Sequence, residues 1–338
     1  MIDSGAASLA RAATSAISDT SAGLSPAEPV VRVRGLVKRF GDRTAVAGVD
    51  LDVHRGEIFG LLGPNGAGKT TTMRAIYGVT IPSDGRVEVF GLDVAAHGRR
   101  VRARLGVTLQ DNVLIEALSP VENLRVFCRY HLLGRAASEK RIEELIAFLS
   151  LASHRDVPVR NLSGGYQRRV AIALSLVAEP ELLILDEPTT GLDPAVRRAL
   201  WDNVRALRDG GATVLLTTHY MDEAERLCDR VAVMSAGKVL AVGSPRELVA
   251  RHLAVDVVEI EGQAAEIAQT TALVSTFSSR VVAVRSGRRT TFHCADGAGL
   301  ADLLRRQDGR HRHDLVVRPS NLEDLFLHLT GSDLEGGA

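Results

Sequence analysis

The first part of the chain alternates apolar and polar positions in a pattern that predicts strands. VVRVRGLVKRF (30–40) and AVAGVDLDV (45–53) place an apolar residue at nearly every second position, as strands with one buried face do. The next segment, GEIFGLLG (56–63), is more continuously apolar and ends in glycine. Such a segment is typical of a strand that is buried on both faces of a sheet.

The pattern then changes from the strand period to the helix period. TTTMRAIYGV (70–79) has helical spacing and predicts a helix directly after the third strand. A Ser-Asp-Gly turn at 83–85 leads into a further predicted strand, RVEVFG (86–91). The stretch 111–160 is predicted to be mainly helical.

Two capping boxes indicate where further helices begin. Ser119 is followed by Glu122, and Ser244 by Glu247, and each pair has a proline at the first helical position. Between them, EKRIEELIAFLSL (139–151) carries apolar residues at helical spacing and predicts a second helix of the helical stretch.

Two short, fully apolar strands are predicted in the second half of the chain. They are ELLILDEP (181–188) and ATVLLTTH (212–219), separated by a helix-like segment as in a β-α-β crossover. The segment RVAVMSAGKVLAVG (230–243) predicts a hairpin. A parallel sheet flanked by helices is therefore expected, and this domain should end near His252.

The pattern changes again from about Leu253. Three short strands and one helix are predicted there: AVDVVEIEG (254–262), RVVAVRSG (280–287), RTTFHC (289–294) and NLEDLFLHLTG (321–331). We therefore expect a tail at 1–28, a main domain at 29–252 with a helical subdomain at about 111–165, and a small α+β appendage at 253–338.

Composition narrows the class of protein and its location. The 338 residues include 41 basic and 41 acidic side chains, and 45% are hydrophobic. This balance is ordinary for a globular protein and argues against a dedicated nucleic-acid binder. The three cysteines have no metal-ligand spacing, which favours a reducing compartment. The excess of arginine over lysine is typical of a GC-rich bacterial genome.

The N-terminal segment and the lack of long apolar runs also bear on location. The first 28 residues have neither the basic start nor the continuous apolar stretch of a signal peptide, and their composition predicts a disordered tail. No apolar run has the length of a membrane span. We therefore expect a cytoplasmic protein, and any membrane role would need a separate partner chain.

The segment from Gly63 to Thr70, GPNGAGKT, fits the pattern of a phosphate-binding loop. It follows a predicted strand and opens a predicted helix, which is the context that this pattern requires. Its glycines let successive backbone N–H groups face phosphate oxygens, and the helix N-terminus adds its positive dipole end. Lys69 is expected to reach the outer phosphates, and Thr70 to bind Mg²⁺.

The ends of the two apolar strands carry a second set of candidate residues. Asp186 ends the first strand, where it can bind Mg²⁺ beside a phosphate-binding loop. Glu187 follows and is expected to polarise an attacking water as general base. His219 ends the next strand, and we expect it to contact the γ-phosphate.

The segment NLSGGYQRR (161–169) raises a different question. It places two glycines and a hydroxyl at a predicted helix start, but no acid, base or metal ligand. A helix start of this kind offers backbone N–H groups to an anion.

Taken together, these motifs resemble the ATP-binding subunits of ABC transporters over roughly residues 30–250. GPNGAGKTT is similar to the Walker A loop, LLILDEP to Walker B with its catalytic glutamate, and LSGGY to the ABC signature. His219 matches the switch histidine, Gln110 the Q-loop glutamine and Asp193 the D-loop aspartate. Phe40 matches the aromatic residue that stacks on adenine.

The resemblance implies a fold and a complete set of site residues. The implied fold is an α/β P-loop ATPase domain with a mixed sheet core, an antiparallel β subdomain and a helical subdomain. The implied catalytic residues are Glu187, His219, Lys69 and Gln110. The implied nucleotide-binding residues are Phe40, Gly63, Pro64, Asn65, Gly66, Ala67, Gly68, Lys69, Thr70, Thr71, Ser163, Gly164, Gly165 and Asp193. The implied Mg²⁺ ligands are Thr70, Gln110 and Asp186.

In this family the signature loop contacts the γ-phosphate of ATP held by the opposite subunit. The chain has one phosphate-binding loop and one signature, so two copies, or a related partner chain, are needed to complete each site, and we favour a homodimer. We expect no nucleic-acid partner. One position departs from the family pattern, because Tyr166 stands where glutamine is usual, and we expect activity to survive the change.

The details within these motifs point to the exporter branch that contains drug-resistance and nodulation-factor ATPases. The supporting segments are TTGLDP, LLTTHYMDEAERLCDR and the tail RPSNLEDLFLHLTG. The implied role is to energise a separate membrane permease, at the cytoplasmic face of a bacterial membrane, for export of a lipid-like, oligosaccharide or drug-like substrate.

Other functions are less consistent with the sequence. A soluble ABC ATPase acting on ribosomes would carry two ATPase modules, and one acting on DNA a long coiled coil. A non-hydrolysing regulator would lack Glu187 or His219, and an unrelated P-loop kinase would not explain the signature. In the tail, His311, Arg312 and His313 are read as a solvated turn rather than a metal site.

Overall fold

A computed structural model describes residues 28–261, 274, 282–286, 289–307 and 315–330. The predicted tail, apart from its last residue, and the cluster at 311–313 lie outside the described residues. The chain divides into two compact units, residues 1–239 and 240–338, each of which is described by itself. Among the described residues, no helix combines the length and apolar character needed to cross a membrane.

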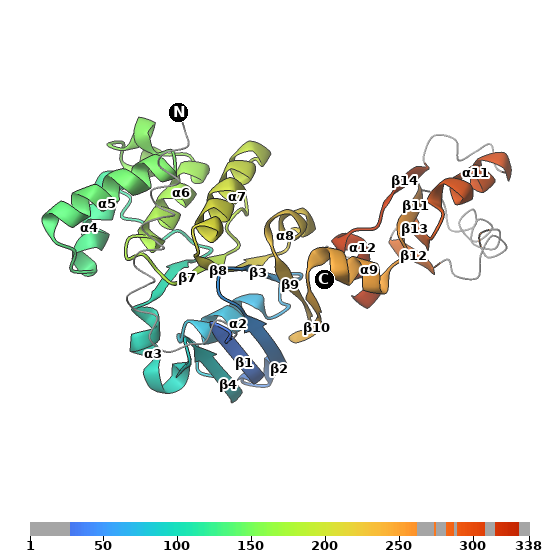
Figure 1. Cartoon of the computed structure of the whole chain (residues 1–338), viewed down its shortest axis with the longest axis horizontal. Coiled ribbons are helices and arrows are strands. Elements are labelled where there is room, and N and C mark those ends of the chain that lie inside the picture. The colour runs from blue at the N-terminus through green and yellow to red at the C-terminus, as the bar shows by residue number, and fades with distance from the viewer. Residues whose placement is uncertain (1–27, 262–273, 275–281, 287–288, 308–314, 331–338) are drawn as a thin grey trace. The chain divides into compact units, whose positions relative to one another are not determined.

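The first unit is built on a mixed sheet whose strands have the order β10-β9-β3-β8-β7-β6, and its edge strand β10 crosses the division of the chain at residues 239 and 240 (Figure 1). The strands are β3 (Ile58–Leu62), β6 (Leu105–Thr108), β7 (Leu182–Asp186), β8 (Thr213–Thr218), β9 (Arg230–Ser235) and β10 (Lys238–Gly243). Every residue of β3, β7 and β8 is buried, which explains their continuously apolar sequences. Pairing is parallel from β9 through β6, so the carboxyl ends of these strands meet at one edge.

A smaller antiparallel sheet has the strand order β2-β1-β4-β5. Its strands are β1 (Val31–Phe40), β2 (Arg43–Val53), β4 (Asp84–Val89) and β5 (Leu92–Asp93). Strand β4 begins at Asp84, so two residues of the turn predicted at 83–85 belong to the strand. Gly85, at φ 84°, lies where the register of β1 and β4 shifts, and a Cβ atom there would meet the carbonyl oxygen of Gly35 at 2.2 Å.

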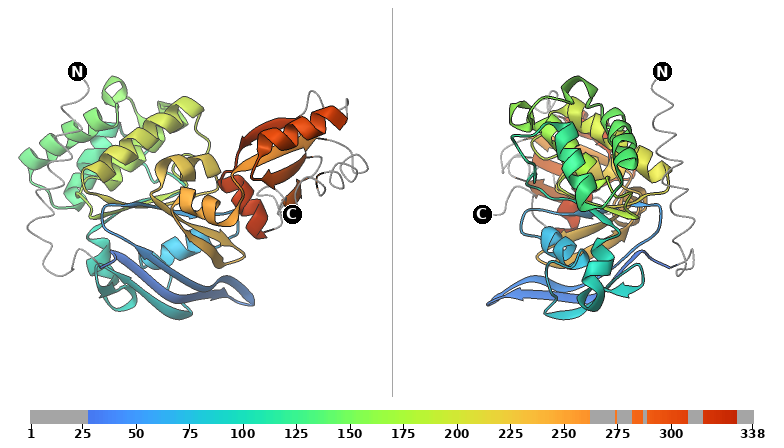
Figure 2. Two further views of the ribbon diagram at one scale, coloured as in Figure 1. Left: turned by 45° about the vertical axis from the view of Figure 1, so that its right-hand side comes forward. Right: turned by 90° about the vertical axis from the view of Figure 1, so that its left-hand side faces the viewer.

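Helices surround the mixed sheet of the first unit. They are α2 (Lys69–Ile76), α3 (Val94–Arg102), α4 (Pro120–Tyr130), α5 (Arg135–Phe148), α6 (Gly164–Ser175), α7 (Pro194–Asp209) and α8 (Met221–Leu227), with short 3₁₀ turns at Ala152–His154 and Val159–Asn161. Helices α4, α5 and α6, green in Figures 1 and 2, lie together on the side opposite the antiparallel sheet. Helix α5 begins four residues before the predicted segment, and α3 has no predicted counterpart.

The predicted capping boxes are both confirmed. The hydroxyl of Ser119 accepts from the backbone N–H of Glu122, whose carboxylate accepts from the backbone N–H of Ser119. Ser244 and Glu247 repeat this arrangement at the start of α9 (Pro245–His252). Each box satisfies backbone donors that a helix start leaves unpaired. Local sequence was therefore sufficient to locate the first residues of α4 and α9.

The second unit contains a four-stranded antiparallel sheet with the order β12-β13-β11-β14. Its elements are β11 (Asp256–Glu261), β12 (Val282–Ser286), β13 (Arg289–Cys294), α11 (Gly297–Gln307), β14 (Val316–Pro319) and α12 (Leu322–Thr330). One face packs under α11 through an apolar cluster that includes Val258, Phe292 and Leu300. Helix α12 carries a buried Asp324 that forms two hydrogen bonds with Arg318, at 2.6 and 2.8 Å.

The second unit includes helix α9, which precedes the predicted domain boundary. Helix α9 contacts α12, and the division of the chain falls between residues 239 and 240, before the predicted boundary at 252 and 253. Strand β14 and helix α11 have no predicted counterpart. The predicted helix at 321–331 corresponds to α12, with Leu322, Leu325 and Phe326 buried.

Candidate active site

The predicted phosphate-binding loop connects β3 to α2. Gly68 caps α2 with a φ of 99°, and a Cβ atom there would lie 2.7 Å from the carbonyl oxygen of Ala45. Glycine suits both the left-handed backbone and this close approach. The first turn of α2 carries no acidic residue, so the positive end of the helix dipole is available to an anion.

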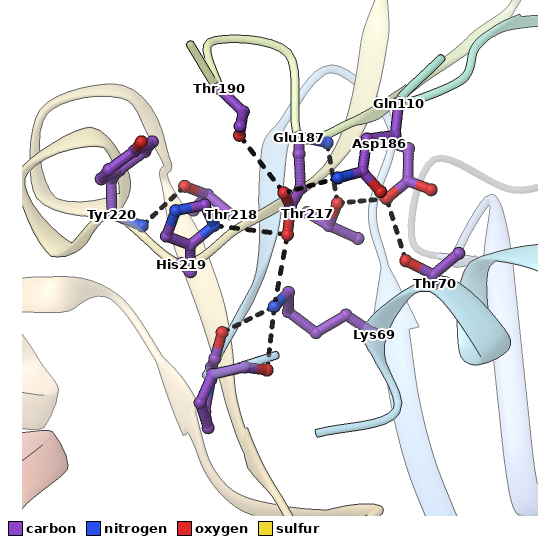
Figure 3. A network of polar contacts seen from close by, with 12 residues as sticks. Lys69, Thr70, Gln110, Asp186, Glu187, Thr190, Thr217, Thr218, His219 and Tyr220 are labelled. Atoms are coloured by element: carbon purple, nitrogen blue, oxygen red, sulfur yellow. Dashed lines mark hydrogen bonds and ion pairs between the residues drawn. The ribbon is translucent and has the colours of Figure 1, made fainter. Parts of the chain in front are cut away.

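Lys69, the first residue of α2, is buried inside this loop. Its Nζ donates to the carbonyl oxygens of Gly63 at 2.6 Å and Pro64 at 3.1 Å, and lies 3.6 Å from Glu187 Oε1 (Figure 3). Burial lowers the pKa of Lys69, whereas the neighbouring carboxylate of Glu187 raises it. The ammonium group is therefore held within the loop, and its contact with the outer phosphates of a nucleotide stays a prediction.

Thr70 and Asp186 bring oxygen atoms together at the carboxyl end of β7. Thr70 Oγ1 donates to Asp186 Oδ1 at 3.3 Å, and Thr217 Oγ1 donates to the same atom at 2.6 Å. Hydroxyl and carboxylate oxygens are ligands that Mg²⁺ prefers, so this pair fits the predicted metal site. The side chain of Gln110 lies beside it, with Nε2 3.4 Å from Glu187 Oε2.

Glu187 is the centre of the polar network shown in Figure 3. Its backbone adopts a left-handed conformation, at φ 46°, and its N–H donates to Thr217 Oγ1 at 2.9 Å. Backbone conformations of this kind are concentrated at functional sites. Thr190 Oγ1 donates to Glu187 Oε2 at 3.2 Å, so the carboxylate is oriented from several segments at once.

His219 follows β8 and faces the same carboxylate. Its Nδ1 lies 3.3 Å from Glu187 Oε1, although the two atoms do not have hydrogen-bond geometry. The imidazole stacks on Tyr220 with ring centroids 4.1 Å apart. The parallel pairing of β7 with β8 thus brings Glu187 and His219 together, as their positions at two strand ends predict.

A pocket of about 520 Å³ opens over this loop. It is lined by Phe40, Arg43, Ala45, Pro64, Asn65, Gly66, Ala67, Gly68, Lys69, Thr70, Thr71, Gln110 and Glu187. Eleven of these were candidates from the sequence, and Arg43 and Ala45 were not. Phe40 is 54% exposed, which leaves its ring accessible for stacking on a base.

The signature residues lie elsewhere. Ser163, Gly164, Gly165 and Asp193 do not line this pocket, and the first two are exposed at the start of α6. Asp193 caps α7 by accepting from two backbone N–H groups, each at 3.0 Å. Within one chain, the phosphate-binding loop and the signature loop are therefore parts of separate surfaces.

Tyr166 lies on the first turn of α6 and packs against neighbouring side chains. Its ring centroid is 4.1 Å from that of His154, and the guanidinium of Arg169 lies 5.3 Å from it. The adjacent Gln167 donates to the carbonyl oxygens of Val159 and Leu162, at 3.2 and 3.1 Å, and so holds the turn before the helix.

We expect Tyr166→Gln to leave ATP turnover within about two- to threefold of the wild-type rate, because tyrosine and glutamine side chains can both donate a hydrogen bond. Such a factor corresponds to a change of about 0.5 kcal/mol in the activation free energy. Ser163, Gly164 and Gly165, which we expect to face phosphate, are unchanged in the variant. Steady-state phosphate release is the measurement, with Tyr130→Gln, at a 76% exposed tyrosine, as the matched control. A hundredfold increase would instead show that Tyr166 cripples the natural site.

Two further residues of the site were not candidates from the sequence. Thr217 contacts both Asp186 and Glu187. Because it lies in an apolar strand, the sequence pattern indicated only a core residue at this position. Arg168 is buried and donates to the backbone of segments that precede and follow it by many residues. The one feature of the sequence that could have identified Arg168 is its position at the start of a strongly apolar helix.

Comparison with known proteins agrees with this geometry. Residues 46–190 match the family model described as ABC transporter. The chain is 43% identical over 309 residues to the Nod factor export ATP-binding protein I of Ralstonia nicotianae, which spans 90% of this chain and 95% of that protein. The chain belongs to the ATP-binding subunits of ABC transporters. This ABC subunit is therefore an ATPase, and the predicted family, fold and ATPase activity are confirmed.

Two solved structures and a second family model extend the comparison of the ABC subunit. It is similar to cbiO1 from Clostridium perfringens, part of the ABC transporter complex cbiONQ, with a TM-score of 0.62 at 31% identity over 66% of this chain and 91% of that one. It is also similar to the ATP-binding cassette MJ0796, whose dimeric structure contains ADP and Pi, with a TM-score of 0.58 at 25% identity over 63% and 98% of the two chains. Residues 268–331 match the C-terminal domain of the nodulation factor export protein NodI.

Proposed function

We propose that the protein hydrolyses ATP as a homodimer in which each site combines two chains. The separation of the signature residues from the pocket supports this arrangement, because one chain presents both halves on different surfaces. A two-fold pairing would then complete two sites at once, with Ser163, Gly164 and Gly165 donating to the γ-phosphate held by the other chain. The dimeric MJ0796 structure is a precedent for such pairing in a similar cassette.

In each site the residues would divide the work of phosphoryl transfer. Phe40 would stack on adenine, the loop from Gly63 to Thr71 would bind the phosphates, and Lys69 would offset their charge. Mg²⁺, held by Thr70, Asp186 and Gln110, would supply positive charge beside the phosphates when bound. Glu187 would orient and deprotonate the attacking water, and His219 would donate to the γ-phosphate. Asp193 would link the two sites across the dimer.

We also propose that a separate membrane permease docks beside the segment that follows Gln110. A groove of about 370 Å³ lies there, with Leu109, Val113 and Phe127 among its lining residues. Val113 is 68% exposed and Leu109, which precedes Gln110, is 37% exposed, so apolar surface is available next to a site residue. Such a partner would place the protein peripherally at the cytoplasmic face of a bacterial membrane, where Gln110 would report the nucleotide state.

Export of a lipid-like, oligosaccharide or drug-like substrate is the transport reaction that we propose. Relatives that align with about nine tenths of the chain are named for Nod factor export, and the C-terminal match is to the same class of protein. The substrate path would lie in the permease rather than in this chain. We propose dimer contacts or regulation for residues 253–338.

Reconstitution with the permease tests the proposed function. We expect Val113→Asp to keep the ATP turnover of the isolated protein and to lose the stimulation of turnover by the permease in vesicles. Val255→Asp, at a 74% exposed valine of the second unit, is the matched control and should keep both activities. Transport of candidate lipids, glycolipids and drugs is measured in the same vesicles. Purification with ribosomes and without a membrane protein would contradict the proposal.

A further inference from the structure

Arg168, on the second turn of α6, makes an unusual set of contacts for a buried arginine. It is 5% exposed, and its donors face oxygen atoms of two segments outside α6. One segment follows β6, where Nη1 donates to the carbonyl oxygens of Leu109 at 2.5 Å and Gln110 at 3.3 Å and to Asn112 Oδ1 at 3.2 Å.

The other segment begins at the end of β7 and contains Asp186 and Glu187. There Nε donates to the carbonyl oxygen of Pro188 at 2.9 Å, and Nη2 to that of Asp186 at 2.7 Å. Arg168 thus binds the backbone on both sides of Glu187, and it also binds the backbone of Gln110. A planar guanidinium with donors fixed in a fork can hold two segments in one relative position, whereas a flexible ammonium cannot.

The position of Arg168 in α6 connects these anchors to the signature loop. Ser163 occupies the N-cap position of the same helix, and Gly164 and Gly165 begin its first turn. A helix transmits displacement along its length because its backbone hydrogen bonds keep it rigid. A shift of the first turn would therefore move the guanidinium, and the guanidinium would move the Gln110 and Glu187 segments together.

We propose that Arg168 is a positioning residue that couples the signature loop of one chain to the Gln110 and Glu187 segments of the same chain. Contact of Ser163 with the partner's nucleotide would then align Glu187 in the chain that supplies the signature, so that one site senses the other. This inference rests on the proposed dimeric function and deepens it. Arg168 touches no reacting atom and acts only through these segments.

The burial of Arg168 is consistent with this role. Burial lowers its pKa to about 10, while the charges of Asp186, Glu223 and Glu187 oppose that shift. The side chain therefore stays cationic at neutral pH, held by nearby acidic charge and by carbonyl dipoles.

The test compares Arg168→Met and Arg168→Lys with Arg141→Met. Arg141 lies on α5 and is also buried, at 7% exposed, and it donates to the carbonyl oxygen of Leu176, just after the last residue of α6, at 2.6 Å. We expect both Arg168 variants to keep the affinity for a fluorescent ATP analogue and to lower kcat about 10²-fold, as misplacement of a catalytic group does. Arg141→Met should lower the melting temperature and leave kcat unchanged.

A double-mutant cycle with Ser163→Ala separates coupling from a purely structural role. We expect Ser163→Ala to lower kcat in the wild-type background and to have little further effect in either Arg168 background. If Arg168→Met does not fold, as judged by circular dichroism, the double-mutant cycle is measured with Arg168→Lys.

Two outcomes would overturn the inference, and they differ in what else they overturn. If Ser163→Ala lowers kcat and the two effects simply multiply, the dimeric site stands and the coupling role of Arg168 is wrong. If Ser163→Ala leaves wild-type kcat unchanged, the signature loop does not act, and the dimeric site and the coupling role are both wrong.

Discussion

Glu187→Gln is expected to bind ATP normally and to lower ATP turnover about 10²- to 10⁴-fold, the usual effect of removing a general base. Glutamine has nearly the same shape as glutamate, so the contacts from Thr190 and the backbone contact to Thr217 can persist. What is lost is the carboxylate that would take a proton from water. The variant should therefore accumulate as a closed dimer with ATP bound.

Two measurements check this expectation. Phosphate release gives turnover, and gel filtration with and without ATP gives the dimer. Glu143→Gln is the matched control, because Glu143 is 56% exposed on α5 and forms an ion pair with Arg155. Neither residue lines the pocket. Wild-type turnover in Glu187→Gln would refute the assignment of Glu187 as general base.

Lys69→Met should weaken ATP binding about 10- to 100-fold, since a hydrogen bond to a charged group contributes about 1.5–3 kcal/mol. Methionine keeps the length of the side chain but cannot donate to phosphate or to the carbonyl oxygens of Gly63 and Pro64. The negative charge of Glu187 would also lose its nearest ammonium, at 3.6 Å. Turnover at saturating ATP should fall as well, because Lys69 would offset charge on the γ-phosphate.

Equilibrium titration with a fluorescent ATP analogue measures the affinity of this variant. Lys238→Met is its control, because Lys238 is an exposed lysine of β10. Unchanged affinity in Lys69→Met, with the fold preserved, would show that the loop binds phosphate through its backbone alone.

These two variants involve residues that local sequence could identify. A phosphate-binding loop is made by consecutive residues, because its backbone turn and the helix start after it form within one short segment. The capping boxes at Ser119 and Ser244 are local for the same reason, and both are confirmed. The apolar segments around β7 and β8 predicted a parallel sheet, which brings Glu187 and His219 to one edge.

Residues that act through distant partners were missed. Arg168 contacts Leu109 across 59 positions, and Thr217 contacts Asp186 across 31. Neither contact follows from the spacing of the residues in the sequence, because the path of the folded chain between the two partners determines how far apart they lie. Arg43 lines the pocket although it lies about 20 residues before the phosphate-binding loop, and α9 contacts α12, which lies about 70 residues later in the chain.

The amino-acid pattern therefore determined the family, the ATPase chemistry and the predicted phosphate-binding loop, since each is recognised from motifs of consecutive residues. The folded chain determined how the carboxylates are held. Thr70 contacts Asp186 across 116 positions, and Arg168 joins the segment that contains Glu187 to the segment that contains Gln110. Long-range pairing of strands and one buried guanidinium set these distances, and no local pattern records them.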